Sequence, residues 1–484
     1  MTFKTTLMAG TVLGVVALAA GSAAAQTPGA SSAQLDALNR QIQALQSQVK
    51  TLSEKLEKEI KAVDKKVVDA PRVSIDNGRP RIRSASGASQ AFDVAIRTRF
   101  HLDYGYWFPD AASGDLPDGF NVRRAFIGLY GTVFTDWNFG INADFSGRGN
   151  AGRLQDLYMG YTGFKGWVIE AGAFQPSFTL MDTISSNDIP FIERSATNNM
   201  AVSIVANEAR TAVGFRHNGT RYRVSAYLTG QQIAQGANPS TTSGGINDDQ
   251  ASAIARVSFL AATGSNYDIH LGANYGYMWE PATNTGNNAA RNYALSERPE
   301  IRIGSAPSFI NTGSIDTDDY SVYGVEFGAT YQAFWTMAEY FEHEFDQRPA
   351  GLPDVNFDSW YVAAGYMLTG ERRAYSVASG NFAAPRVSWP FRTSGGYGTG
   401  AWELAVRYSE ANLTDAGVPL NAAGRNQGDQ SVWTLGVNWY VNPAIRFMLN
   451  YNIIEVDRPR SATGALIGTD RELESLAMRM QFQF

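Results

Sequence analysis

From residue 92 onwards, the chain is a succession of short stretches in which apolar and polar side chains alternate. In the stretch 92–107 the even positions begin with Phe92 and Val94, whereas the odd positions include Asp93 and Arg97. Side chains on a β-strand point alternately to opposite faces, so each stretch predicts a strand with one apolar and one polar face. One such strand fits a soluble sandwich as well as a membrane barrel, so the number of stretches has to distinguish the two folds.

We count sixteen alternating stretches, of which Ser475–Phe484 is the last. The alternation is weaker near 122–133, 152–161, 167–174 and 334–345, and the faces of 122–133 and 334–345 are ambiguous. An even number of strands with Tyr, Trp and Phe near the ends of the apolar face is typical of a bacterial outer-membrane barrel. We therefore predict an all-β transmembrane barrel of about 16 antiparallel strands over residues 91–484.

Short joins alternate with long polar segments along the predicted barrel, as expected for periplasmic turns and outer loops. One long segment, 369–400, falls on the periplasmic side when the strands are counted. Two interpretations remain open at this point. The segment folds into the mouth of the barrel, or the count of strands is wrong by one pair.

The first 69 residues differ from the barrel in composition. Residues 1–25 combine Lys4 with an apolar stretch and the small residues Ala23–Ala25, a pattern that predicts a cleavable signal peptide. In residues 26–69, apolar side chains from Leu35 onwards recur at spacings of three and four. This spacing predicts an α-helical coiled coil that associates with copies of itself, placed in the periplasm.

Residues 70–90 form a basic linker between the predicted coiled coil and the barrel. The sequence Asp76-Asn-Gly78 lies between short apolar positions and favours a small hairpin. The arginines of the linker are suited to phosphates or peptidoglycan carboxylates, and the alternative is a linker that is only solvated. The sequence leaves both interpretations open.

Composition excludes several chemical functions. The chain has no cysteine, which rules out disulfides, zinc–thiolate sites and thiol catalysis. Its four histidines, at positions 101, 217, 270 and 343, do not have metal-ligand spacing. We find no glycine loop suited to phosphate binding and no nucleophile–base pair. The sequence therefore predicts no metal, no cofactor, no nucleic-acid partner and no enzyme.

Several stretches resemble the phosphate-selective porin O and P family. They are Phe120-Asn-Val-Arg-Arg-Ala-Phe-Ile-Gly-Leu-Tyr-Gly131, Trp137 to Phe145, Gly172-Ala-Phe-Gln-Pro-Ser-Phe178, Phe191-Ile-Glu-Arg-Ser195, Leu368-Thr-Gly-Glu371 and Gly400 to Ser409. The resemblance implies a homotrimer of sixteen-stranded barrels in the outer membrane of a Gram-negative bacterium. It also implies one pore per barrel, narrowed by an inward-folded third loop, and anions steered by arginines and lysines. A terminal aromatic residue, here Phe484, would be read by the outer-membrane assembly machinery.

Eight arginines fall on the predicted inner face and are candidates for the ion pathway. They are Arg97, Arg99, Arg216, Arg223, Arg256, Arg407, Arg446 and Arg479. A guanidinium group stays charged and matches the oxygens of phosphate or carboxylate with several donors. The alternative for each is a structural ion pair with an acid on the same face, and the sequence does not choose between these roles.

The segment Gln175–Ala209 is the candidate for the inward-folded loop, with Phe178, Glu193 and Arg194 as the constriction residues. Here the chain departs from the phosphate-binding pattern, because Lys165 is the only lysine after residue 90. From residue 91 on, 28 Lys and Arg against 39 Asp and Glu give a net charge of −11. High-affinity phosphate binding is therefore in doubt at the level of sequence.

Two hypotheses for function follow. The first is an outer-membrane porin that passes small hydrophilic solutes, anions such as phosphate or related oxyanions, through an arginine-lined lumen. The second is an envelope tether, in which the coiled coil and the linker bind peptidoglycan and the barrel is mainly an anchor. A third class, an outer-membrane hydrolase, lacks a clustered set of catalytic residues in the sequence. Expected partners besides other copies are membrane lipids, lipopolysaccharide and the assembly machinery.

Overall fold

The computed structural model of the chain divides at residue 70 into two compact units. The described residues are 32–69, 71–76, 78–85, 91–109, 116–146, 152–233, 246–248, 250–284, 291–303, 308–392, 396, 398–418, 427–457 and 471–484. The predicted signal peptide, residues 1–25, lies outside them.

The first unit contains one long helix, α2, over Ser32–Asp69. Its apolar stripe is exposed in the described chain, since Leu45 is 58% and Leu52 66% accessible to solvent. A stripe of this kind favours association with another helix. The predicted helix is therefore present, whereas its partner in a coiled coil remains a prediction. No helix among the described residues is long and apolar enough to span a membrane.

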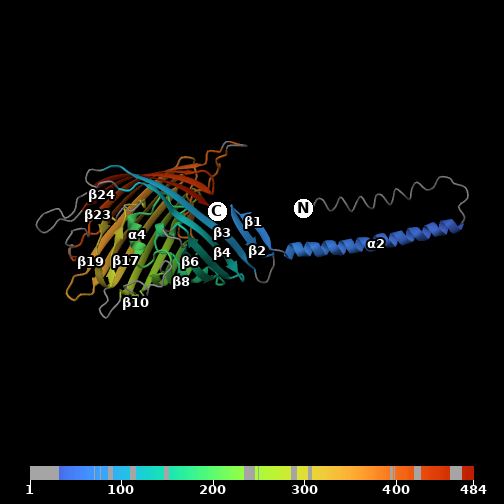
Figure 1. Cartoon of the computed structure of the whole chain (residues 1–484), viewed down its shortest axis with the longest axis horizontal. Coiled ribbons are helices and arrows are strands. Elements are labelled where there is room, and N and C mark those ends of the chain that lie inside the picture. Colours follow the sequence, from blue (N-terminus) through green and yellow to red (C-terminus); the bar gives the residue numbers. More distant parts are fainter. Residues whose placement is uncertain are drawn as a thin grey trace. The chain divides into compact units, whose positions relative to one another are not determined.

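Sixteen strands of the second unit form a closed antiparallel barrel (Figure 1). They are β3 Asp93–Trp107, β4 Gly119–Val133, β5 Trp137–Asp144, β6 Arg153–Tyr161, β7 Trp167–Phe174, β8 Arg210–Asn218, β9 Tyr222–Gln232, β11 Ala251–Thr263, β12 Tyr267–Glu280, β17 Ile315–Tyr331, β18 Phe334–Gln347, β19 Val355–Met367, β22 Ala401–Asn412, β23 Asp429–Tyr440, β24 Ile445–Asp457 and β25 Arg471–Gln483. Each pairs with the next, and β25 returns to β3 with Ser475 opposite Trp107. The predicted count of sixteen strands is confirmed.

The ambiguous alternation of 122–133 has a structural cause, a β-bulge in β4. In the pairing with β3, Arg123 is an extra residue between Val122 and Arg124. One inserted residue reverses the face that the following side chains take. Accordingly Val122 and Ile127, five residues apart, are both about half exposed on the outer face, at 50% and 49%.

The other ambiguous stretch, 334–345, lies in β18, whose inner face is apolar. Trp335, Met337 and Phe341 are at most 1% exposed. They belong to buried apolar clusters that also contain residues of the 175–209 segment. A strand whose inner face is covered by protein carries apolar residues on that face too, so the alternation between apolar and polar positions weakens.

The described parts of three segments between strands fold into the barrel and contribute to its apolar core together with inner-face residues of the strands. The segments are 175–209 after β7, 281–314 after β12 and 368–400 after β19. The 175–209 segment contains the helices α3 Leu180–Thr183 and α4 Ala196–Ser203. The other two segments contain the short strands β13 Thr283–Asn284, β14 Asn292–Tyr293, β15 Ser296–Glu297, β16 Ile310–Asn311, β20 Tyr375–Ser376 and β21 Asn381–Phe382. A further short strand, β10 Ile246–Asp248, lies after β9. Figure 1 shows α4 within the ring of strands. Gly328 permits this packing, because a Cβ there would lie 2.4 Å from the Phe382 ring.

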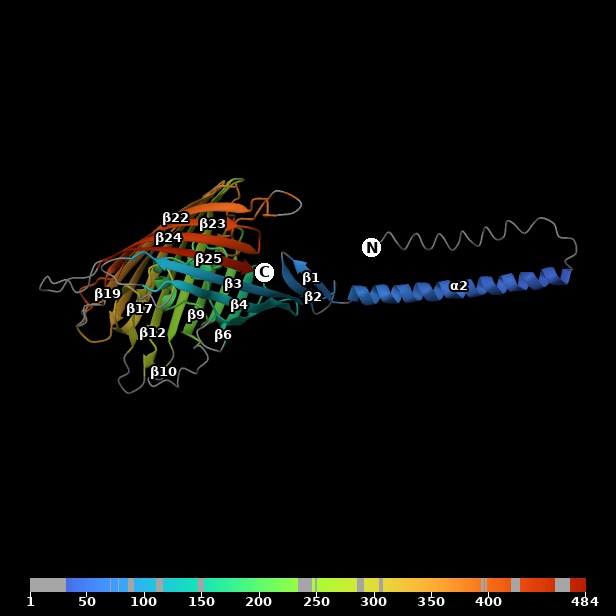
Figure 2. The same cartoon turned by 45° about the horizontal axis from the view of Figure 1, so that its top comes forward.

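The described part of the linker forms the predicted hairpin. β1, Arg72–Asp76, pairs with β2, Arg79–Arg83, and Gly78 at the turn has a φ of +81°, which suits glycine. β2 also pairs with the start of β3, with Arg83 opposite Asp93. Figure 2 shows the hairpin beside the beginning of β3 and the end of the chain. The hairpin thus extends the barrel sheet beyond the end of β25.

Candidate solute pathway

A polar cavity of about 390 Å³ lies between the 175–209 segment and the inner faces of β3, β4 and β6 to β9. Its charged lining consists of five arginines and four acids. They are Arg97, Arg99, Arg194, Arg216 and Arg223, and Asp156, Glu170, Asp182 and Glu208. Charged side chains on an inner wall attract water and small ions. This cavity is the candidate solute pathway.

Two of the arginines predicted for the pathway, Arg97 and Arg99, reach this cavity from β3. The guanidinium carbon of Arg97 lies 4.7 Å from the centre of the Tyr130 ring. Arg99 donates hydrogen bonds to the hydroxyl oxygens of Ser186, at 2.7 Å, and Ser185, at 3.1 Å. These hydrogen bonds and this ring contact of the two side chains are therefore with uncharged groups.

Arg216 on β8 and Arg223 on β9 reach the same cavity. Arg216 lies 3.4 Å from a carboxylate oxygen of Glu170, which makes a loose ion pair. Arg223 donates a hydrogen bond to the carbonyl of Ala378 in the 368–400 segment. Arg223 thus connects the wall of the cavity with the 368–400 segment.

Two further predicted pathway arginines, Arg256 and Arg479, form buried bidentate pairs. Arg256 on β11 donates to both carboxylate oxygens of Glu326, at 2.8 and 2.7 Å, and to the carbonyl of Gly380 at 2.8 Å. Arg479 on β25 donates to both carboxylate oxygens of Asp103, each at 2.7 Å. These contacts satisfy most of the donors of each guanidinium group. Arg256 therefore connects β11 with β17 across the intervening β12, and Arg479 connects the paired strands β25 and β3.

The remaining two, Arg407 and Arg446, fasten segments inside the barrel. Arg407 on β22 pairs with Glu300 of the 281–314 segment and donates to the carbonyl of Glu193 at 3.0 Å. Arg446 on β24 donates to the carbonyl of Ile189 at 2.8 Å. These arginines therefore hold the 175–209 segment against the inner wall.

The three predicted constriction residues occupy different environments. Phe178 is fully buried in the apolar core. Arg194 lines the cavity and donates to the carbonyls of Met181, at 3.3 Å, and Ile184, at 2.9 Å. It therefore braces the turn around α3, whereas Glu193, its neighbour in sequence, points into a cluster of cations.

Glu193 contacts three arginines from three parts of the chain. Its carboxylate oxygens lie 2.7 Å from Arg123, 3.1 Å from Arg479 and 3.7 Å from Arg302. Burial opposes the charged form, but Arg123, Arg124 and Arg479 outweigh this effect and hold the pKa of the Glu193 carboxyl well below its usual range. Glu193 is therefore a charged link between the loop and the wall.

Asp182, in contrast, titrates near neutral pH. Burial penalises the charged form of Asp182 and is the largest effect on its pKa. Arg194 favours the charged form, whereas Glu208 repels it. Together these effects raise the pKa of Asp182 to about 6. One carboxylate oxygen accepts a hydrogen bond from Gln175, and the other has no donor among the described residues. The charge of this cavity residue therefore changes within the physiological pH range.

Sequence reasoning missed Arg123 and Arg124 as interior residues. The bulge directs both neighbours inward, since Arg123 pairs with Glu193 and Arg124 is only 3% exposed. Strict alternation would have placed one of them outside. The available signal was the pair of adjacent arginines at the point where the alternation of 122–133 breaks.

Sequence reasoning also left open the position of 369–400, and the structure resolves it. The count of sixteen strands holds, and the described part of the segment folds into the barrel from the end at which β3 begins. Arg373 donates to both carboxylate oxygens of Glu403, at 2.6 and 2.9 Å, and to the carbonyl of Asp188 at 2.9 Å. Segments from opposite ends of the barrel therefore meet inside it.

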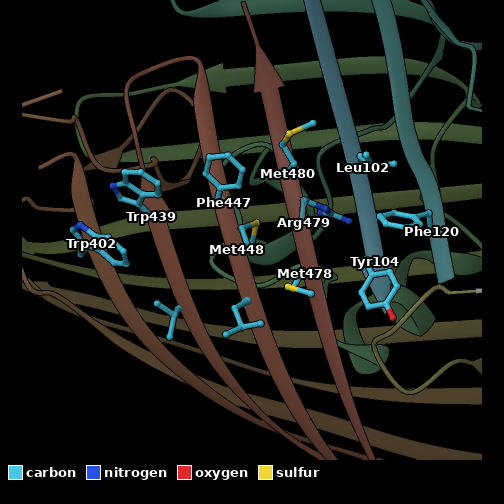
Figure 3. Close-up of a pocket in the computed structure, with 12 residues that line it drawn as sticks. Leu102, Tyr104, Phe120, Trp402, Trp439, Phe447, Met448, Met478, Arg479 and Met480 are labelled. Carbon is cyan, nitrogen blue, oxygen red and sulfur yellow. The ribbon is translucent and has the colours of Figure 1, made fainter. Parts of the chain in front are cut away.

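An apolar concavity of about 630 Å³ lies on the outer face of the barrel, over β22 to β25, β3 and β4 (Figure 3). Trp402, Trp439, Phe447 and Met480 line it, and the rings of Trp402 and Trp439 stack with centres 5.4 Å apart. An apolar, aromatic outer surface is suited to the membrane. This hollow therefore belongs to the outer wall and not to the solute pathway.

The end of the chain completes the ring of strands. The main-chain carbonyl of Phe484 accepts a hydrogen bond from the Thr98 amide at 2.9 Å, and its ring lies 5.7 Å from that of Phe482. The last residue therefore continues the pairing of β25 with β3. In the part of the chain that the structure describes, no three His, Asp or Glu side chains are grouped to hold a metal ion.

A closed barrel of sixteen strands, apolar outside and with a charged cavity inside, defines the class of outer-membrane porins. Comparison with known proteins places the chain more narrowly. It belongs to the family "Phosphate-selective porin O and P", whose model matches residues 94–484. The resemblance seen in the sequence is thus confirmed. The protein is a channel of the outer membrane of Gram-negative bacteria and not an enzyme.

Similar proteins include one with an assigned name. Porin O of Pseudomonas aeruginosa is 26% identical over 423 residues, which cover 81% of this chain and 89% of the relative. An uncharacterized protein of Caulobacter vibrioides is 25% identical over 396 residues, 81% of this chain and 73% of the relative. Among solved structures, the anion-selective porin from Comamonas acidovorans gives a TM-score of 0.48 at 10% identity, covering 81% of this chain and 100% of that one. This structural likeness is too low to add to the family assignment.

Proposed function

We propose that the protein passes small oxyanions by diffusion through the cavity beside the 175–209 segment. The observation that carries the proposal is the excess of cations there, five guanidinium groups against four carboxyl groups. Guanidinium donors match phosphate and carboxylate oxygens. Several weak sites in series allow an ion to enter and to leave. Inorganic phosphate is the first oxyanion to test, because the family is described as phosphate-selective.

In this proposal the 175–209 segment narrows the pathway. Phe178 anchors the segment in the core, and Glu193 links it to the wall through arginines. Arg194 contributes its charge to the narrowed passage. Arg97, Arg99, Arg216 and Arg223 form the conducting wall, while Arg256, Arg407, Arg446 and Arg479 hold the structure that confines the passage.

The test is the reversal potential of reconstituted protein in graded potassium chloride, with and without phosphate. Wild-type protein should prefer anions, and phosphate should reduce its chloride conductance. Arg97→Gln should lower the anion preference by up to about fivefold, since one charge a few ångströms away in water contributes about 1 kcal/mol. The control is Arg221→Gln, because Arg221 lies in the turn before β9 and donates to the carbonyls of Leu260 and Ala261. A wild-type cation preference without phosphate block would refute the proposal.

We extend the proposal to assembly and place a homotrimer in the outer membrane, in contact with lipids and lipopolysaccharide, with α2 as a coiled coil in the periplasm. The exposed apolar stripe of α2 supports self-association. Sedimentation of the intact protein in detergent should give three copies, and removal of residues 32–69 should weaken their association. A monomeric intact protein would contradict this assignment.

A second role, an envelope tether, is favoured by the length of α2. A helix of 38 residues spans about 57 Å, which is enough to reach well away from the membrane. Removing residues 31–89 should then release attachment to peptidoglycan without changing permeability. Unchanged envelope integrity after this deletion would remove the support for a tether.

We assign to Phe484 the role of an assembly signal, because it ends the closing strand with an aromatic ring. Phe484→Asp should reduce the amount of folded protein in the outer membrane more than the conductance of each inserted channel. Gln483→Asp is the neighbouring control for added charge. Equal insertion of the Phe484→Asp variant and the wild type would exclude this role.

A further inference from the structure

The β1–β2 hairpin borders a second polar cavity at the periplasmic end of the barrel. This cavity has a volume of about 270 Å³, and Asp76, Arg79 and Arg81 of the hairpin contribute to its lining. Arg97 of β3 lines both this cavity and the 390 Å³ cavity of the candidate pathway. The two cavities therefore adjoin at Arg97, and the hairpin lies where a solute would leave or enter.

The two faces of the hairpin differ in polarity. Residues directly opposite each other on paired strands point to the same face, and Asp76 stands opposite Arg79 while Val73 stands opposite Ile82. Val73 and Ile82 are 77% and 46% exposed and form an apolar face. Asp76, Arg79 and Arg81 of the polar face line the cavity, so their charges act on the pathway, whereas Arg72 on the same face lies outside the lining.

Ion pairs fix the polar face against the barrel. Arg81 donates to a carboxylate oxygen of Asp93 at 2.7 Å, and Arg83 to the same carboxylate at 3.2 Å. Arg83 also pairs with Asp76, on the other strand of the hairpin. Asp93 is the first residue of β3, so the hairpin is held to the wall by charge-assisted hydrogen bonds as well as by strand pairing.

Arg79 differs from its neighbours on the hairpin. Among the described residues it forms no ion pair or side-chain hydrogen bond, whereas Arg81 and Arg83 both have carboxylate partners. Burial and then the charge of Arg97 lower the pKa of Arg79, whereas the nearby carboxylate of Asp188 acts in the opposite direction. Arg97 contacts the Tyr130 ring. Two guanidinium groups that repel each other thus line the same cavity, and Asp188 offsets only part of the effect at Arg79.

We propose that Arg79 of the hairpin and Arg97 of β3 together bind a small oxyanion, so that the hairpin forms part of a binding site at the periplasmic end of the solute pathway. An anion between the two guanidinium groups is attracted to both of them and accepts hydrogen bonds from both, which offsets their mutual repulsion. The site faces water on one side, which keeps binding weak enough for release. This inference rests on the proposed function, because it assumes that oxyanions use the neighbouring cavity.

The experiment measures block of the potassium chloride conductance by inorganic phosphate in single channels of the full-length protein. Arg79→Gln should raise the half-blocking concentration of phosphate about twofold to fivefold, the range expected for one partly exposed charge. The matched control is Arg72→Gln, which makes the same change on an exposed residue of the same hairpin outside the lining of the cavity. Arg72→Gln should leave the half-blocking concentration unchanged.

Arg97→Gln separates failure of this inference from failure of the proposed function. If Arg97→Gln weakens the phosphate block but Arg79→Gln behaves like Arg72→Gln, the hairpin is not part of the pathway and the inference is wrong. If neither Arg97→Gln nor Arg79→Gln changes the block, oxyanions do not use this cavity and the proposed function fails with it. A weaker block in both variants supports the two-arginine site.

A second measurement uses the absence of cysteine from the chain. Arg79→Cys introduces the single thiol of the protein, and a sulfonate-bearing methanethiosulfonate reagent converts that position from a cation in the wild type to an anion. Chloride conductance should fall upon modification of Arg79→Cys and stay constant upon modification of Arg72→Cys. Complete labelling of Arg79→Cys with no change in conductance would overturn the proposal.

Discussion

The inner surface of the barrel has two parts in which arginine side chains make different kinds of contact. The open wall, the residues of β3, β4 and β6 to β9 that line the 390 Å³ cavity, holds its arginines with hydroxyls, rings and one loose ion pair. The covered wall, the inner faces of β11 to β25, holds its arginines in buried pairs or on carbonyls of the inward-folded segments. The same residue type on the same face of a strand thus lines a cavity or braces the interior according to what lies over it.

Solvent explains this difference. On the open wall, water screens a guanidinium group and lets it exchange partners. On the covered wall, the segments 175–209, 281–314 and 368–400 exclude water, so an arginine there needs fixed acceptors. Phe178, Trp335 and Phe341 fill the space around those pairs and are at most 1% exposed. The covered wall is therefore closer to the core of a soluble protein than to a channel lining.

The largest expected effect is on stability. Arg479→Gln should reduce the free energy of unfolding by about 3–5 kcal/mol, because it leaves Asp103 buried without its bidentate partner and removes one of the arginines around Glu193. Arg97→Gln, on the open wall, should change it by less than about 0.5 kcal/mol. Denaturant unfolding of the folded barrel in detergent, followed by tryptophan fluorescence, measures both. Similar losses in the two variants would remove the distinction between the walls.

The next effect is on conductance. Arg373→Gln removes the bidentate partner of Glu403 and the contact with the Asp188 carbonyl, so it should loosen the 368–400 segment and open part of the covered wall to water. Single-channel conductance should rise and become noisier. Arg386→Gln is the control, because Arg386 is exposed on the same segment. A quiet channel of wild-type conductance in the Arg373→Gln variant would show that this pair does not keep the covered wall closed.

The smallest effect is a dependence on pH within the open wall. Because burial raises the pKa of Asp182 to about 6, lowering the pH through this value removes a negative charge from the cavity. Anion preference, measured as a reversal potential, should therefore increase between about pH 7.5 and about pH 5. Asp182→Asn should show the higher anion preference at both values and lose the step. If the anion preference of Asp182→Asn changes by the same amount over this pH range, the change belongs to another titrating group.

Alternation predicted the strands well because it records a local requirement. Each strand of a membrane barrel has lipid on one side, so its apolar positions can be read without knowing its neighbours. The alternation was ambiguous at two places for two different reasons. In β4 the extra residue Arg123 reverses the faces, and in β18 the inner side chains, such as Trp335, are apolar because protein covers them.

The candidate site was only partly predictable. The alternation of apolar and polar positions placed Arg97 and Arg479 on the inner faces of their strands. It gave no means to distinguish an arginine that lines a cavity from one in a buried ion pair. The partner of Arg479, Asp103, is 376 positions away in the chain, and Glu193 is 286 positions away. Contacts between such distant residues depend on how the barrel closes and on which segments enter it.

The amino-acid sequence by itself therefore determined the sixteen strands, the outer faces of all of them except β4 and β18, the long helix and the family of the protein. Tertiary structure decided which arginines face water, where the 368–400 segment goes, and that Arg123 and Arg124 both point inward. The physical reason is that lipid acts on every strand separately, whereas exclusion of water from the interior requires segments from different parts of the chain to meet. The contacts among these segments divide the inner surface into an open wall and a covered wall.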